Sequence, residues 1–243
     1  MKTNSRKQRG YTIIELMIAM ALMALISGVV FQQITTAQQR SAHEQVKLDL
    51  FQETRDFMDQ MTRDLHQAGY PNIRNFTDGT ITSVNDQRVA IGLVKMDYNH
   101  LWFEGDVDGT GTVSSVQYYI DNEGDDCPCL KRSQIGKITA DPLTGQGTPS
   151  FQTEVQHVQN GTSSTDAIFF AYDANNNLIT TLPIDYKNDP ATIASIATIK
   201  VALTAQSPIK DLKTNLRPSI NMVSTVKLNN CSMATSSKPM SCQ

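Results

Sequence analysis

A block of 21 residues that are almost all apolar, residues 11–31, constrains this chain more than any other feature. Besides the tyrosine at its start, its polar side chains are Thr12, Glu15 and Ser27. Folded as a helix, the block is about 31 Å long, which is roughly the thickness of the hydrocarbon core of a bilayer. The sequence therefore predicts a helix that can cross a membrane once.

The leader before this block carries four basic residues and no acid: Lys2, Arg6, Lys7 and Arg9. Basic residues next to an apolar span favour a cytoplasmic amino end. Glu15 is unusual, because an ionisable side chain five residues into an apolar run is costly in lipid. We therefore interpret Glu15 as a functional residue whose partner is still to be identified.

Together, the basic leader, Gly10, the acid at a fixed offset and the apolar run closely resemble the class III signal of type IV prepilins and of type II secretion pseudopilins. In that family a prepilin peptidase cuts after the glycine, and the new amino terminus is N-methylated. The resemblance implies cleavage between Gly10 and Tyr11, methylation of Tyr11, and a role for Glu15 in pairing with the amino terminus of another subunit. Tyr11 replaces the usual phenylalanine. An ordinary secretory signal has a shorter apolar core and a small-residue cleavage site, and a plain signal anchor leaves Glu15 unexplained.

A distal segment, residues 32–69, is predicted to continue the same helix, because residues 32–45 are polar and nearly unpatterned but contain no Pro or Gly. Apolar residues recur at helical spacing from Val46 to Ala68, with charged residues on the opposite face. Gly69 then provides a left-handed end, and Pro71 prevents continuation. We expect one helix over residues 11–68, about 87 Å long, with its distal half packed on a globular domain.

After Tyr70 the pattern changes to short runs with period two, separated by turns rich in Gly, Asn, Asp and Pro. Predicted strands span residues 87–93, 113–120, 129–135, 151–158, 167–172, 196–204 and 219–228. Asp189 and Pro190 predict one short helical turn over residues 189–195. The absence of amphipathic helices between the strands favours antiparallel sheets. The expected fold class is thus α+β, with residues 70–243 forming the β-rich domain, and the resemblance to prepilins implies the type IV pilin fold.

The end of the predicted helix, Asp64-Leu65-x-x-Ala68-Gly69-Tyr70, is similar to that of PilW-type minor pilins, as is the later strand motif that begins at Ile196. This resemblance implies a structural subunit involved in pilus assembly, at the tip of the pilus. Its implied partners are other minor pilins, the major pilin, the prepilin peptidase, an inner-membrane assembly platform and, before assembly, lipid. A J-type pseudopilin of type II secretion and a pilus-borne adhesin or DNA-uptake subunit remain alternatives.

The four cysteines, Cys127, Cys129, Cys231 and Cys242, all follow the membrane segment. The predicted orientation places them in the periplasm and later outside the cell, where disulfides persist. Three connectivities exist. A Cys231–Cys242 bond is favoured, because it closes a terminal loop of the kind that pilins use, over a Cys127–Cys129 bond or two bonds that join the pairs. A zinc site is the less favoured use of four cysteines.

Asp106, Asp108 and Thr110 resemble the first half of a calcium loop, but Gln117 stands where such loops need a bidentate carboxylate. We therefore favour an ordinary hairpin loop, with structural calcium as the alternative and no other cofactor. The sequence contains no catalytic motif, which predicts that the chain is not an enzyme. Without the leader the chain has 17 Lys and Arg against 24 Asp and Glu, a net charge of −7, so no nucleic-acid partner is expected.

Overall fold

The computed structural model describes residues 10–76, 81, 86–124, 127–210 and 215–229. The chain divides into two compact units, Met1–Val46 and Lys47–Gln243. Helix α1, Ile13–Gln67, begins in the first unit and ends in the second. Gly69 has a φ of 78°, and the Tyr70 N–H donates to the Gln67 carbonyl at 3.0 Å. A glycine adopts this left-handed conformation without strain, so it ends the helix where the sequence predicted.

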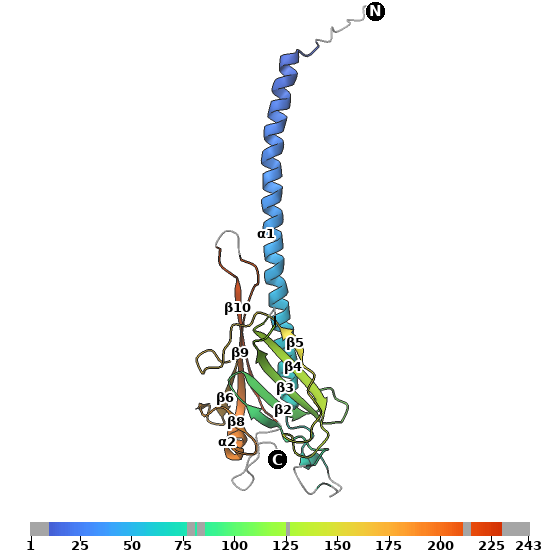
Figure 1. Cartoon of the computed structure of the whole chain (residues 1–243), viewed down its shortest axis with the longest axis vertical. Coiled ribbons are helices and arrows are strands. Elements are labelled where there is room, and N and C mark those ends of the chain that lie inside the picture. Colours follow the sequence, from blue (N-terminus) through green and yellow to red (C-terminus); the bar gives the residue numbers. More distant parts are fainter. Residues whose placement is uncertain (1–9, 77–80, 82–85, 125–126, 211–214, 230–243) are drawn as a thin grey trace, which may run out of the picture. The chain divides into compact units, whose positions relative to one another are not determined.

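The second unit contains two antiparallel sheets (Figure 1). The larger sheet has the order β5-β4-β3-β2-β1-β8, and the smaller has the order β10-β9-β6-β7. The strands of the larger sheet are β1 Leu93–Met96, β2 His100–Gly105, β3 Ser114–Asp121, β4 Cys129–Gly136, β5 Gln152–Val155 and β8 Ile184–Asp185. Those of the smaller sheet are β6 Phe169–Asp173, β7 Leu178–Ile179, β9 Ile196–Gln206 and β10 Ser219–Lys227. The expected α+β class, a long amino-terminal helix with an antiparallel β-sheet domain, is confirmed and is consistent with the type IV pilin fold.

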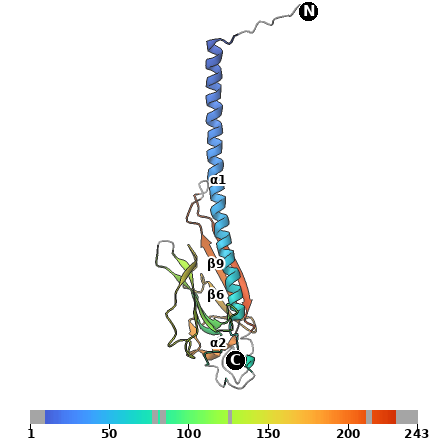
Figure 2. The same ribbon diagram turned by 90° about the vertical axis from the view of Figure 1, so that its right-hand side faces the viewer.

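The core of the second unit lies where the end of α1 meets the two sheets (Figure 2). Phe57, Met61 and Leu65 of α1 are at most 2% exposed. They belong to one continuous apolar cluster with Phe103 of β2 and Val201 of β9. The apolar residues that recur at helical spacing in the sequence therefore form the face that this end of the helix buries.

Polar contacts also join the end of α1 to both sheets. The Asp64 carboxylate accepts hydrogen bonds from Tyr118 of β3 and Arg132 of β4. On the other sheet, the Thr62 hydroxyl lies 3.3 Å from the Ser224 hydroxyl of β10. These contacts fix the rotation of the helix end as well as its position, because each requires one defined face of the helix.

Three sequence predictions about the β-rich unit need correction. The strand predicted at 87–93 begins only at Leu93, because the Asp86 carboxylate accepts the Arg88 N–H and forms a turn. Strand β2 was not predicted, although it lies in the middle of the larger sheet. Helix α2, Pro190–Ser195, is present, but the Asp189 side chain makes no capping hydrogen bond.

Candidate functional site

The first turn of α1 is closed by a reciprocal pair of side chains, Thr12 and Glu15. The Thr12 hydroxyl accepts the Glu15 N–H at 3.3 Å, and the Glu15 Oε2 accepts the Thr12 N–H at 3.2 Å. The Thr12 hydroxyl also lies 3.3 Å from the same Glu15 oxygen. This arrangement is a capping box, in which a threonine before the helix and a glutamate three residues later satisfy two backbone N–H groups that the helix leaves free.

The capping box provides Glu15 with a partner within its own chain. A carboxylate in the first helical turn is also stabilised by the partial positive charge of the helix amino end. The cost of placing an acid in the apolar run is thus reduced locally, before any other subunit is present. From the sequence, Thr12 was recognised only as a polar residue of the span. The pattern Thr-x-x-Glu before an apolar run was the local signal that could have identified its role.

The predicted cleavage site lies immediately before this turn. Gly10 and Tyr11 are both exposed, with Tyr11 88% accessible, and they precede the first residue of α1. A Cβ atom at position 10 would have no neighbour within 4 Å. The bond between Gly10 and Tyr11 is therefore sterically open. Its cleavage, and the methylation of Tyr11, remain predictions, and the basic residues of the leader lie outside the described residues.

The apolar side chains after Glu15 are exposed on every side of the helix. All residues from 10 to 42 are exposed, including Ile18, Leu25 and Phe31. In water so much contiguous apolar surface is unfavourable, and it marks a surface that lipid or other protein covers. By length and composition, α1 is the one helix in the described part of the chain that could cross a membrane.

The loop between β2 and β3 holds the residues considered for calcium. Asp106 Oδ2 accepts the Gly111 N–H at 2.9 Å, and Asp108 Oδ1 accepts the Thr110 hydroxyl at 2.8 Å. The loop is thus closed by its own donors. Within the described residues, no group of three or more His, Cys, Asp or Glu side chains is arranged to hold a metal. Asp106 and Asp108, with the Thr110 hydroxyl, could supply three oxygen ligands, fewer than calcium usually takes.

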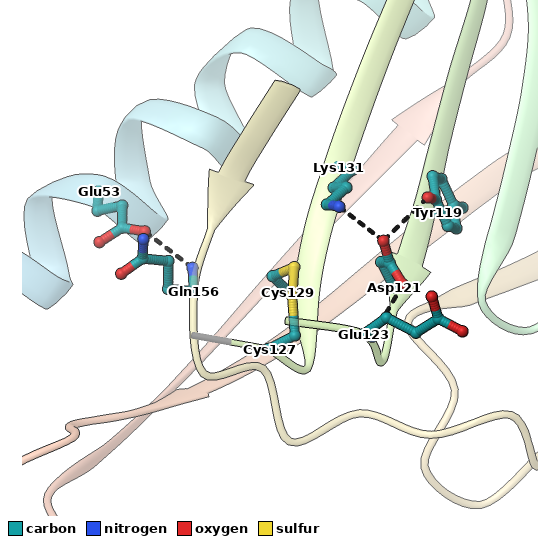
Figure 3. Close-up of a disulfide and its surroundings, with 8 residues drawn as sticks. All are labelled: Glu53, Tyr119, Asp121, Glu123, Cys127, Cys129, Lys131 and Gln156. Atoms are coloured by element: carbon teal, nitrogen blue, oxygen red, sulfur yellow. Dashed lines mark hydrogen bonds and ion pairs between the residues drawn. A yellow bond between two sulfur atoms is a disulfide. The ribbon is translucent and has the colours of Figure 1, made fainter. Parts of the chain in front are cut away.

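A disulfide joins Cys127 to Cys129 at the start of β4 (Figure 3). Beside it, Lys131 pairs with Asp121 at 2.6 Å across the β3–β4 hairpin, and the Tyr119 hydroxyl donates to the same carboxylate at 3.2 Å. The structure thus contains the Cys127–Cys129 bond, which the sequence pattern favoured less than Cys231–Cys242. Cys231 and Cys242, the favoured pair, lie outside the described residues.

Comparison with protein families finds a match to the prokaryotic N-terminal methylation motif over residues 5–31. The matched segment includes Gly10, Tyr11 and the capping box, and it ends where the apolar block ends. No curated protein and no solved structure matches the chain. The motif is that of type IV prepilin-like proteins, a structural class rather than an enzyme family, and it implies processing by a prepilin peptidase and assembly with other pilins. Together with the long apolar helix it is consistent with a membrane-anchored, single-pass protein.

Proposed function

We propose that this chain is a minor pilin of the PilW type, which joins the tip of a type IV pilus and helps to initiate its assembly. The observation that carries this proposal is the methylation motif, which continues into an exposed apolar helix with Glu15 in its first turn. Before assembly, lipid covers the helix, while the β-rich unit lies in the periplasm. After assembly, the helices of neighbouring subunits replace the lipid and the unit becomes extracellular.

In the proposed filament, the Glu15 carboxylate of one subunit pairs with the amino group of Tyr11 of another. Cleavage after Gly10 would create that amino group at the start of the mature chain. Two unit charges about 4 Å apart attract by about 4 kcal/mol at an effective dielectric constant of 20. A charge left alone in lipid is unfavourable, so the pair favours both the transfer out of the bilayer and one axial register between subunits.

Two features support a tip position rather than a place in the shaft. The β-rich unit is larger than a repeating shaft subunit needs, with ten strands among its described residues. In addition, residue 22 of the mature chain is Gln32, where major pilins often have proline. A single large subunit at the end of a filament meets no steric limit from identical neighbours.

The test separates the two roles of Glu15, capping and charge pairing, by substitution in cells. In Glu15→Gln the amide oxygen can still accept the Thr12 N–H, but the negative charge is absent. We expect this variant and Glu15→Leu to be processed normally and to be depleted at least tenfold from sheared pili, measured by immunoblot against total cellular protein. Ser27→Ala removes another polar group from the same span and should leave incorporation unchanged.

Full incorporation of Glu15→Gln would contradict charge pairing and would leave capping as the role of the acid. The wild-type chain should also co-purify with pili, and its deletion should reduce piliation. If deletion instead blocks protein secretion and leaves piliation intact, the chain is a pseudopilin of type II secretion, which carries the same motif.

A further inference from the structure

A solvent-facing hollow lies on the outer face of the larger sheet, away from the apolar core. Its volume is about 360 Å³, and its lining comes from the β1–β2 turn, from β2 and β3, and from the residue before β5. The lining residues are Asp97, Asn99, His100, Gln117, Tyr119 and Phe151. Strand alternation explains this set, because Tyr118 and Ile120 of β3 are buried in the core while Gln117 and Tyr119 point to the other face.

Two aromatic rings form an apolar wall of the hollow. The Tyr119 and Phe151 rings meet edge to face, with centroids 4.6 Å apart, and His100 lies against Tyr119 at 6.2 Å. All three side chains are half-buried. The Tyr119 hydroxyl is held by Asp121, which is itself paired with Lys131 (Figure 3). The rings are therefore held in place with part of their surface exposed.

Polar groups with unused hydrogen-bonding capacity complete the lining. Asp97 Oδ1 accepts the Tyr98 N–H at 2.7 Å, whereas Asp97 Oδ2 and the Asn99 amide make no hydrogen bond within the described part of the chain. Gln117 Oε1 lies 3.3 Å from His100 Nε2. Burial, reinforced by the charge of Lys95, lowers the pKa of His100, so its ring is neutral near pH 7. The hollow thus offers a carboxylate, two amides and a neutral imidazole.

This combination selects a class of ligand. A sugar ring presents an apolar C–H face that suits aromatic walls, and hydroxyl groups that both donate to carboxylates and amides and accept from amides. Among the described residues no lysine or arginine lines the hollow, and Asp97 repels negative charge, which disfavours phosphates and acidic sugars. Ligand pockets span roughly 300–1,000 Å³, and this volume at the lower end suits one or two sugar rings.

We propose that this hollow binds a neutral saccharide unit, with Tyr119 and Phe151 against its C–H face and Asp97, Asn99 and Gln117 on its hydroxyls. The site gives the chain a binding role in addition to the proposed structural one. It does not depend on assembly, because every lining residue belongs to the second compact unit.

The experiment uses the full chain in lauryldimethylamine oxide, a detergent without a sugar headgroup. The chain is applied to an array of glycans that end in glucose, galactose, mannose, fucose, N-acetylglucosamine or sialic acid. Neutral glycans that bind are then titrated by saturation-transfer NMR against the wild type and three variants. Asn99→Ala and Phe151→Ala should weaken binding at least tenfold, while Phe170→Ala, in β6 of the other sheet, should retain it within twofold.

Circular dichroism and thermal midpoints check that the variants fold. Asn99→Ala keeps the test valid if Phe151→Ala does not fold, because the Asn99 side chain supports no described contact. Three results would overturn the proposal: no binding of any neutral glycan, binding of sialylated glycans alone, or affinity unchanged in Asn99→Ala and Phe151→Ala.

Discussion

At the scale of single residues, the carboxylate of Glu104, near the end of β2, is a charged group in a costly, fully buried position. Its Oε2 accepts Lys137 Nζ at 2.7 Å and the Ile91 N–H at 3.0 Å, and both charged side chains are 0% exposed. Its Oε1 is buried and has no partner within the described residues. Burial raises the pKa of Glu104, and the charge of Lys137 only partly offsets this effect. A buried ion pair of this kind contributes little net stability, but loss of one partner is destabilising.

This raised pKa predicts how stability depends on pH. In the unfolded chain Glu104 ionises near its ordinary pKa, which is a lower pH than in the folded chain. Folding therefore favours the protonated form of Glu104. The contribution of Glu104 to the free energy of unfolding is therefore fully present below about pH 4.5, and it is lost as the pH rises through the pKa of Glu104 in the folded chain. As the pH rises through this range, the free energy of unfolding of the wild type should fall relative to that of Glu104→Gln. The expected fall is about 1.4 kcal/mol for each unit by which folding raises the pKa of Glu104.

Trp102, the single tryptophan of the chain, lies two residues away and reports unfolding. Denaturation of the detergent-solubilised chain, followed by tryptophan fluorescence between pH 4 and 8, gives the difference between the two proteins. Were the wild type to gain stability over Glu104→Gln as the pH rises, the attraction of Lys137 would outweigh burial and the direction of the pKa shift would be wrong.

At the scale of elements, Asp64 attaches the end of α1 to the larger sheet. Its carboxylate accepts Tyr118 at 2.5 Å and Arg132 at 2.8 Å, and its side chain is 7% exposed. Burial and the charge of Asp64 raise the pKa of Tyr118 well above its ordinary value, so the phenol stays a hydrogen-bond donor. The helix is thus attached to β3 and β4 by a charged hydrogen-bond network, and its displacement would take the only carboxylate away from Tyr118 and Arg132 among the bonds described for them.

Removal of Asp64 should therefore be more destabilising than removal of the Tyr118 hydroxyl. Asp64→Ala leaves Arg132 without its carboxylate partner, with the Tyr118 hydroxyl and the Gln134 amide oxygen still accepting from it, and should lower the free energy of unfolding by about 3 kcal/mol. Tyr118→Phe removes one hydrogen bond and should cost about 1 kcal/mol. Asp59→Ala on the exposed side of the same helix, where Asp59 is 3.9 Å from Arg55, is the matched control and should change stability by less than about 0.5 kcal/mol. Equal effects of Asp64→Ala and Asp59→Ala in urea denaturation would show that the attachment is not energetically important.

The β2–β3 loop gives a second prediction at this scale, which concerns calcium. Asp106 and Asp108 already accept donors of their own loop, and Gln117 lies in β3 rather than in the loop. We therefore expect the thermal midpoint of the chain to be the same, within a degree, in 5 mM calcium and in excess chelator. A rise of several degrees that calcium produces and magnesium does not, and that Asp108→Ala abolishes, would establish the calcium site instead.

The elements also show which parts of the fold could be predicted from sequence. Strands β9 and β10 were predicted nearly in full, because one face of β9 is buried and its apolar residues alternate from Ile199 to Ala205. The run from Val89 to Val94 is buried on all sides and does not alternate, so it gave no signal for where β1 begins. The capping box was missed, although its Thr-x-x-Glu pattern is local and could have been recognised in the sequence. The Glu104–Lys137 pair and the saccharide hollow could not be predicted, because their residues meet only through strand pairing.

At the scale of the whole molecule, removal of the leader changes both charge and chemistry. The full chain has a net charge of −3, and loss of the four leader bases leaves −7. More important, cleavage would convert the Tyr11 backbone amide into a positively charged amino group next to the Thr12–Glu15 capping box. In an uncleaved chain the Tyr11 nitrogen remains an uncharged peptide amide. Processing would therefore create the positive partner that Glu15 of another subunit requires.

The proposed pairing of Glu15 with the new amino group predicts how a chain that cannot be cleaved behaves. Gly10→Val should keep residues 1–10, remain in the membrane at normal levels, and be absent from sheared pili. Intact mass spectrometry of the purified wild type should show a chain that begins at Tyr11 and carries one added methyl group, and the variant should retain its leader. Gly28→Ala, a substitution in the same helix that meets no atom within 4 Å, should be processed and assembled as the wild type is. Entry of the uncut Gly10→Val chain into pili would show that the amino group at Tyr11 is not required, and with it the proposed pairing with Glu15 would fail.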